Sequence, residues 1–170
     1  MLTYKKISIA FFITIILLVV SFTIFAYILI NKSKPNYNFK FETDKVFDEV
    51  NIYRDSIGIV YINSKNDFDA AFALGYTHAQ ERLFQMDLIR RAASGRLSLV
   101  FGSKTVPFDK MFLTLGIKEA AKEKLLRLDN NTKKILEAYS AGVNYFIKNN
   151  KANLPIEFSI LNYIPYAWKP

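Results

Sequence analysis

The sequence predicts a mainly α-helical fold with one N-terminal β-hairpin, preceded by a transmembrane helix. Three observations lead to this prediction. Residues 7–30 contain no charged side chain. Residues 46–63 hold two short runs rich in β-branched and aromatic side chains, as strands do. Much of the remaining chain repeats its apolar side chains every three or four residues, which is the period of a helix.

The uncharged segment 7–30 is long enough to cross a bilayer. A helix of this length spans about 36 Å, against a hydrocarbon core of about 30 Å. Its hydroxyl side chains are scattered and can bond to their own helix: Ser8, Thr14, Ser21 and Thr23. A cleaved secretory signal has a shorter apolar core and small residues at its cleavage site, which residues 25–28 do not offer. We therefore expect an uncleaved signal anchor.

The composition of the segments on either side of the expected anchor indicates what they are. Residues 1–6 are expected to be a cytoplasmic tail and residues 31–45 a linker without regular structure. Lysines flank the span on both sides, so the positive-inside rule leaves its orientation open. A short tail before a large C-terminal part is the usual arrangement with the N-terminus inside. We therefore expect residues 46–170 on the extracytoplasmic side, with the lipid bilayer as a partner of residues 7–30.

The hairpin is predicted from residues 46–53 and 59–63, joined by a turn over residues 54–58. Asp55 stands at the start of this turn and Gly58 at its end, where a positive φ is needed. A hairpin alone is marginally stable in water, so it must pack on a helix or join a sheet.

The longest helix is predicted from Asn66, its N-cap, to just before Gly95, its left-handed C′ residue. Asp69 stands three residues after Asn66, as in a weaker version of a capping box. Its apolar or small side chains share one face, and they are Phe68, Phe72, Gly75, Ala79, Leu83, Met86 and Ile89.

Shorter elements are predicted after this helix. Residues 96–101 add one helical turn that ends at Gly102, and residues 103–116 form a packed loop with at most one turn of helix. An amphipathic helix covers 117–128 and another 132–149, the latter capped by Asn130 or Asn131. Residues 152–170 are rich in proline and aromatic residues and are expected to be extended.

Composition and charge exclude several functions. The formal charge is 23 − 15 = +8, but lysines and arginines alternate with acids at helical spacing, as on a solvated face. Nucleic acid is therefore not an expected partner, since no basic patch with interleaved aromatic residues is present. The absence of cysteine rules out disulfides and thiolate chemistry.

A search for catalytic, metal-binding or substrate-binding residues assigns none. His78 and Glu81 are spaced to share a helix face, but a di-metal carboxylate site needs two such pairs, so a hydrogen-bonded surface histidine is the better interpretation. Ser98 has no predictable base. Arg54 and Asp55 are read as turn residues. Four arginines could bind an acidic group, but pairing with Asp87, Glu81 and helix-end carbonyls is favoured for them: Arg82, Arg90, Arg91 and Arg96. Gln80 and Gln85 would need partners if buried.

An ordered series of motifs resembles the N-terminal part of the penicillin acylase (penicillin amidase) family of N-terminal-nucleophile hydrolases. The series is Arg54-Asp55 with Gly58-Ile59, Phe72 to Tyr76, His78 to Leu88, Arg90-Arg91, Gly95 to Ser98, Ala138-Tyr139 with Gly142 to Asn144, Leu154-Pro155 with Glu157-Phe158, and Trp168 to Pro170. Val60, Tyr61 and Leu99 depart from the family's usual Pro, His and acid at these positions, which alters the hairpin exit and removes a carboxylate.

The resemblance implies an enzyme made as one precursor that cuts itself into an α and a β chain and hydrolyses linear amides. The new N-terminal Ser, Thr or Cys of the β chain would be the nucleophile, with its own amino group as base. Related members act on β-lactams, acyl-homoserine lactones or lipopeptides, and many bind calcium. In the family these groups lie beyond residue 170, so no catalytic, calcium or pocket residue is carried over and no cofactor is expected in this chain.

The expected protein is therefore the N-terminal piece of a bacterial membrane-anchored amidohydrolase, part of an αββα fold and inactive alone. Its second partner would be the downstream part of the same precursor, whose sheet the long helix and the hairpin would cover. The alternative is a non-catalytic, membrane-tethered helical interaction module.

Overall fold

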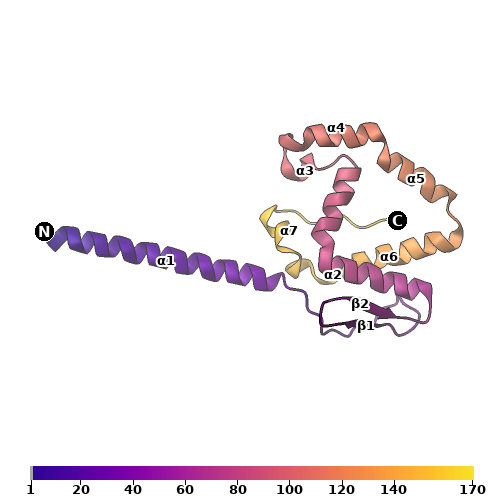
Figure 1. Ribbon diagram of the computed structural model, residues 1–170, viewed down its shortest axis with the longest axis horizontal. Coiled ribbons are helices and arrows are strands. Elements are labelled where there is room, and N and C mark those ends of the chain that lie inside the picture. The colour runs from indigo at the N-terminus through magenta and orange to yellow at the C-terminus, as the bar shows by residue number, and fades with distance from the viewer. Residues whose placement is uncertain (1) are drawn as a thin grey trace. The chain divides into compact units, whose positions relative to one another are not determined.

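The computed structural model describes residues 2–170, with the backbone alone for Leu2, Thr3, Lys5 and Ser8. It divides into two compact units, one up to Lys34 and one over Pro35–Pro170. The first unit is essentially one helix, α1 (Leu2–Lys32) (Figure 1).

Helix α1 contains the predicted apolar segment and extends beyond it at both ends. Its large apolar side chains from Tyr4 to Ile30 are mostly exposed. Thr14 and Thr23 donate to carbonyl oxygens four residues earlier, at 3.0 and 2.8 Å, as predicted. Ser8, for which the same was predicted, lies outside the described side chains. By length and composition, the part from Ile9 to Lys32 could cross a membrane.

Helix α2 (Asp67–Ala93) is the central element of the second unit, and both its predicted ends are confirmed. The Asn66 side chain accepts from the Asp69 amide at 2.9 Å. At the other end Gly95 has a φ of 61°, and the Arg96 amide donates to the Arg91 carbonyl at 2.8 Å, which closes the last turn.

Helix α2 is bent at Arg82, whose φ of −139° and ψ of 22° are not helical. The change of direction is visible in Figure 1. The apolar face is buried on both sides of the bend, at Phe72, Ala79 and Leu83, whereas Ile89 near the end is exposed.

Helix α6 (Asn130–Asn149) covers the apolar face of α2. The two backbones touch, because a Cβ atom added to Gly142 would lie 2.0 Å from the Phe72 carbonyl oxygen, and one added to Gly75 would lie 2.0 Å from that of Tyr139. We expected the face of α2 to cover a sheet supplied by a downstream part of the protein. That expectation was wrong, since a later helix of the same chain covers it.

Strands β1 (Asn51–Arg54) and β2 (Val60–Asn63) form the predicted antiparallel hairpin. Asp55 organises the turn, since its Oδ1 accepts from the amides of Ile57 and Ile59 at 3.0 and 2.8 Å. The first strand is shorter than the predicted 46–53. The amides of Phe47 and Asp48 donate to the Asp69 carboxylate, both at 2.9 Å, and are bound there instead of in a ladder.

Residues 103–116, predicted as a loop, contain the 3₁₀ turn η1 (Ser103–Thr105) and the ten-residue helix α4 (Val106–Leu115). Pro107 lies in the first turn of α4, where its missing N–H costs nothing. The predicted turn α3 (Ser98–Phe101) and the predicted helix α5 (Ile117–Arg127) are both present.

The cap of α6 is Asp129, not Asn130 or Asn131 as predicted, because the Asp129 carboxylate accepts from both the amide and the hydroxyl of Thr132, at 2.9 and 2.6 Å. The C-terminal segment is only partly extended. It contains the 3₁₀ turn η2 (Lys151–Asn153) and the short helix α7 (Ile156–Ile160). Burial of Leu154 and Phe158 in the core favours this compact turn over an extended chain.

The hydrophobic core lies between α2, α6 and the segment around α7. Its buried members are Tyr76, Ala79, Leu83, Val143, Phe146, Ile147, Leu154 and Phe158. Phe39 and Phe41 also pack against this cluster, although they fall in the predicted linker 31–45. They position the segment that borders the groove described next.

Candidate functional site

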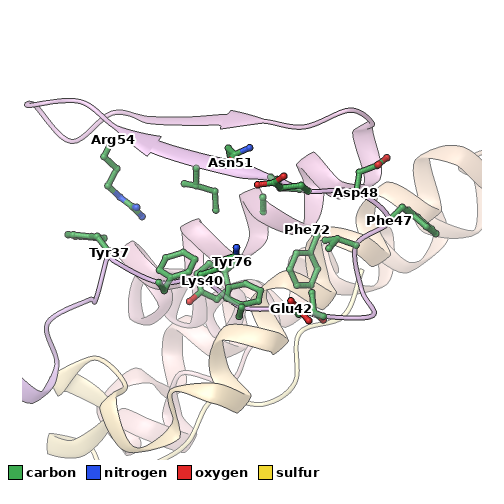
Figure 2. Close-up of a pocket in the computed structure, with 17 residues that line it drawn as sticks. Tyr37, Lys40, Glu42, Phe47, Asp48, Asn51, Arg54, Phe72 and Tyr76 are labelled. Carbon is green, nitrogen blue, oxygen red and sulfur yellow. The ribbon is translucent and has the colours of Figure 1, made fainter.

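A groove of about 730 Å³ lies between strand β1 and the segment of residues 37–43 (Figure 2). Phe72, Ala73 and Tyr76 of α2 line it as well. The turn around Phe47 connects its two sides at one end, and Arg54 and Tyr37 approach each other at the other end (Figure 2).

Arg54 crosses from β1 to helix α2 at its end of the groove. Its Nη2 donates to Gln80 Oε1 at 2.5 Å and to Glu81 Oε1 at 3.2 Å, and its guanidinium lies 4.2 Å from the centre of the Tyr37 ring. Gln80 in turn donates to the Asn36 carbonyl at 2.9 Å. Gln80 is buried, so the expectation that it would need partners is confirmed.

The same group of side chains leaves one polar atom unsatisfied. Arg54 Nε is buried and has no hydrogen-bond partner among the described residues. Tyr37 donates its hydroxyl to Glu81 Oε2 at 3.2 Å, and burial together with the nearby Glu81 carboxylate raises the pKa of Tyr37. This end of the groove is therefore polar, and the unsatisfied Nε lies beneath its surface.

A second polar cluster surrounds Asp87, whose side chain is completely buried. It accepts from Arg90 Nη2 at 2.5 Å, from Arg91 Nε at 2.7 Å and from the Tyr163 hydroxyl at 3.0 Å. The predicted pairing of both arginines with Asp87 is confirmed. Burial alone would raise the pKa of Asp87, but the hydrogen bonds from Arg91 and Arg90 outweigh it and lower that pKa. Burial raises the pKa of Tyr163 to about 12, with help from the Asp87 charge.

The Asp87 cluster fastens the C-terminal segment to α2. Arg90 donates to the carbonyl oxygens of Tyr166 and Ala167 at 3.0 and 3.1 Å, and its guanidinium lies 4.2 Å from the Trp168 ring. Asn144 of α6 holds the Trp168 backbone from the other side, through bonds of 2.7 and 2.9 Å. Sequence reasoning missed these contacts, because the partners are 24 positions apart for Asn144 and Trp168 and 76 or 77 for Arg90 and its carbonyl partners, and no local period links them.

The other candidate residues from the sequence make ordinary structural contacts or are exposed. His78 Nδ1 lies 3.1 Å from the Tyr139 hydroxyl, as expected of a hydrogen-bonded surface histidine, and Glu81 pairs with Arg54 instead. The amide of Ser98 donates to the buried carboxylate of Asp109 at 2.9 Å. Arg82, Gln85 and Arg96 are exposed.

Within the part of the chain that the structure describes, no three His, Asp or Glu side chains are placed to hold a metal ion. The groove offers apolar contacts and polar side chains to a bound group. The Asp87 cluster holds the C-terminal segment against α2.

The fold is similar to part of a solved penicillin G acylase structure. The structure of the thermostable penicillin G acylase from Alcaligenes faecalis matches with a TM-score of 0.65 and 24% sequence identity, over 71% of this chain and 66% of that chain. At this identity the likeness concerns the fold alone. The family model for penicillin amidase matches residues 49–170. The chain belongs to the penicillin amidase family.

Relatives with similar sequences are named as acylases. The penicillin acylase 2 proenzyme of Pseudomonas sp. (strain SE83) is 40% identical over 121 residues, and the acyl-homoserine lactone acylase QuiP of Pseudomonas aeruginosa is 33% identical over 121 residues. Penicillin G acylase of Escherichia coli is 31% identical over 126 residues. These matches cover 71–72% of this chain but only 14–16% of the relatives.

Proposed function

We propose that this chain is the N-terminal part of a membrane-anchored amidohydrolase that hydrolyses the C–N bond of linear amides, and that it has no turnover alone. The observation that carries the proposal is the family match over residues 49–170, combined with relatives named as acylases of which the chain spans about one sixth. The described residues supply a packed helical region and a hairpin.

The chemistry proposed for the whole protein is acyl transfer to an N-terminal nucleophile. A Ser, Thr or Cys exposed by self-cleavage attacks the amide carbonyl with its own α-amino group as base, and fixed hydrogen-bond donors stabilise the tetrahedral intermediate. We place the nucleophile, the donors and any calcium ligands outside residues 2–170. β-Lactams and acyl-homoserine lactones are the substrate classes suggested by the names of the relatives.

The proposed location is the bacterial cytoplasmic membrane, crossed once by residues 7–30, with the second unit outside the cytoplasm. The length and apolar character of α1 support an anchor, although a signal sequence shares these properties. Nucleic acid is not a proposed partner.

The proposal is tested by reading the DNA that follows the codon of Pro170 and by assaying the purified chain. We expect an in-frame continuation with a Ser, Thr or Cys at a processing site, and no hydrolysis of penicillin G or of an N-acyl-homoserine lactone by the 170-residue chain in detergent. Turnover by this chain would contradict the proposal. A stop codon after Pro170, together with cooperative unfolding of the chain as a monomer, would favour the interaction module instead.

A further inference from the structure

The turn end of the hairpin exposes apolar and aromatic side chains to solvent. Ile57 in the turn is 79% exposed, and Tyr53, Ile59 and Tyr61 are each at least half exposed. Tyr53 and Tyr61 are cross-strand partners, which places them on the same face of the hairpin. Ile59 is two positions before Tyr61 and so lies on that face as well. We call these four side chains the hairpin tip.

The backbone of the turn forms its hydrogen bonds within the turn itself. The Asp55 amide donates to the Ile59 carbonyl at 3.2 Å, and the Gly58 amide donates to the Asp55 carbonyl at 3.1 Å. The amides of Ile57 and Ile59 donate to the Asp55 carboxylate. Four of the five amides in residues 55–59 therefore have an acceptor inside the turn. A segment that leaves water for a lipid layer needs its backbone groups satisfied in this way.

The chain enters the second unit at the same end of the hairpin. Arg54, the last residue of β1, lies with its guanidinium 4.2 Å from the centre of the Tyr37 ring, as the pair is drawn in Figure 2. Tyr37 lies five residues after Lys32, the last residue of α1. Five residues span at most about 18 Å. The covalent chain therefore keeps the turn end of the hairpin near the surface of any bilayer that α1 crosses.

We propose that the hairpin tip is a second contact with the bilayer, inserted among the lipid headgroups beside the anchor. Ile57 and Ile59 enter the boundary between headgroups and acyl chains, and Tyr53 and Tyr61 lie at the headgroup level, where tyrosine is enriched. The tether gives the tip a high effective concentration at the bilayer, so that a contact of this small size forms. Two contacts restrict the rotation of the second unit about its linker. The inference rests on the proposed membrane location and is independent of amide hydrolysis.

The test measures the depth of a dye on the tip, with the full 170-residue chain in vesicles of phosphatidylethanolamine and phosphatidylglycerol. The chain has no cysteine, so Ile57→Cys carries the dye at one position. Some vesicles contain a lipid with a nitroxide quencher in the headgroup, and others a lipid with the nitroxide at the end of an acyl chain. We expect the headgroup nitroxide to quench the dye on Ile57→Cys at least about twofold more strongly than the chain-end nitroxide. A blue-shifted emission without quenching by either lipid would overturn the inference, because a protein surface, such as a second copy, would then cover the tip.

Two further labelling sites serve as controls. Asn63 is exposed at the other end of β2, about 13 Å along the strand from Ile59. The dye on Asn63→Cys should be quenched weakly by both lipids, and equal quenching at Ile57→Cys and Asn63→Cys would overturn the inference.

Leu17→Cys reports on the anchor itself and should be quenched most by the chain-end nitroxide. Quenching at Leu17→Cys but not at Ile57→Cys would overturn the inference and leave the proposed membrane location standing. Absence of quenching at both sites would contradict the membrane location and the inference together.

A matched pair of substitutions at Ile59 shows whether the protein or the dye enters the bilayer. Ile59→Val and Ile59→Thr have side chains of the same shape, and both keep the β-branch that suits a strand, but threonine carries a hydroxyl. In the Ile57→Cys background, Ile59→Thr should reduce quenching by the headgroup nitroxide at least about twofold, with Ile59→Val close to the unmodified chain. The circular dichroism spectrum should be the same in both. Equal quenching in the two variants would mean that the dye inserts by itself, and would overturn the inference.

Discussion

Asp87 accepts three hydrogen bonds in a position that water does not reach. Asp87→Asn keeps the size of the side chain but removes its charge, which leaves the cations of Arg90 and Arg91 without a counter-ion. Breaking a buried pair in this way typically costs about 3–5 kcal/mol. We expect a loss of that size in the free energy of unfolding, measured by urea titration with the fluorescence of Trp168, the chain's one tryptophan.

Glu123→Gln is the matched control. It removes an exposed ion pair with Arg127, in which the charged atoms are 3.8 Å apart. Pairs of this kind contribute about 0.3–0.5 kcal/mol on a helix. Similar losses in the two variants would show that the Asp87 cluster does not stabilise the fold.

The lowered pKa of Asp87 predicts a loss of stability in acid. The folded pKa lies below the unfolded value of 3.8, so the folded state binds fewer protons than the unfolded state near that pH. The contribution of Asp87 is therefore complete above the unfolded pKa and is lost as pH falls through the folded pKa. The urea concentration at which half of the protein is unfolded should be lower at about pH 3 than at about pH 6. This decrease should be smaller in Asp87→Asn. Parallel curves for the two proteins would contradict the assignment.

For single residues, contacts between side chains a few positions apart could be predicted from the sequence, whereas contacts between distant parts of the chain could not. The turn at Asp55 and the pairing of Asp87 with Arg91 follow from spacings of a few residues. The bond between Asp87 and Tyr163, or between Arg54 and Gln80, depends on how elements fold onto each other, which no spacing encodes. The cap of α6 was misplaced by one or two residues because Asp129 and the two asparagines that follow it are all good caps.

At the scale of elements, the crossing of α2 and α6 depends on two glycines. In an exposed helix, Gly→Ala stabilises by about 1 kcal/mol. Gly142→Ala should have the opposite sign, because the new Cβ atom would lie 2.0 Å from the Phe72 carbonyl oxygen and would force the helices apart. We expect a loss of about 1–3 kcal/mol in thermal or urea unfolding, as for overpacked cores.

Ala120→Ser on α5 is the control for this variant, since it adds one heavy atom at an exposed helical position. It should change stability by no more than about 0.5 kcal/mol. A stabilised Gly142→Ala protein would mean that the two helices do not touch as described.

Helices with a regular apolar period were predicted well, as α2 and α5 show. Helix α4 was missed because the apolar residues of 103–116 show no clear period. Its folding is instead supported by the buried carboxylate of Asp109, which binds the amides of Leu97 and Ser98 at 2.7 and 2.9 Å. The alternation of buried and exposed side chains in residues 39–43 was overlooked because it is short and follows closely after the apolar segment 7–30 in the sequence.

At the scale of the whole molecule, the proposed anchor predicts how the chain behaves in membranes. Leu17→Arg combined with Leu18→Arg should release it from the membrane, since each arginine at the centre of a span costs about 2.5–3.5 kcal/mol. The double alanine variant at the same positions should stay membrane-bound. Resistance to carbonate extraction measures both. An arginine variant that remains resistant would exclude the anchor.

The orientation can be measured because the chain has no cysteine. Thr3→Cys and Ser159→Cys each introduce one thiol, and Ser159 is exposed. An impermeant maleimide added to intact spheroplasts should label Ser159→Cys at once and Thr3→Cys only after lysis. Labelling in the reverse order would place the second unit in the cytoplasm.

The family resemblance was readable from motifs, and the fold class from patterns. The groove was not foreseen, because its sides come from a segment expected to be a linker and from a strand predicted too long. Exposed apolar side chains such as Phe108, Met111 and Leu115 are not explained by the contacts within residues 35–170.

The bend at Arg82 divides α2 into two halves that hold different parts of the molecule. The half before the bend bears Phe72 and Tyr76, and the half after it bears Asp87 and Arg90. Each residue added or removed between them would turn one half by about 100° around the helix axis relative to the other. A single-residue insertion near the bend would therefore misalign everything that is attached beyond it, whereas a substitution leaves the two halves in register.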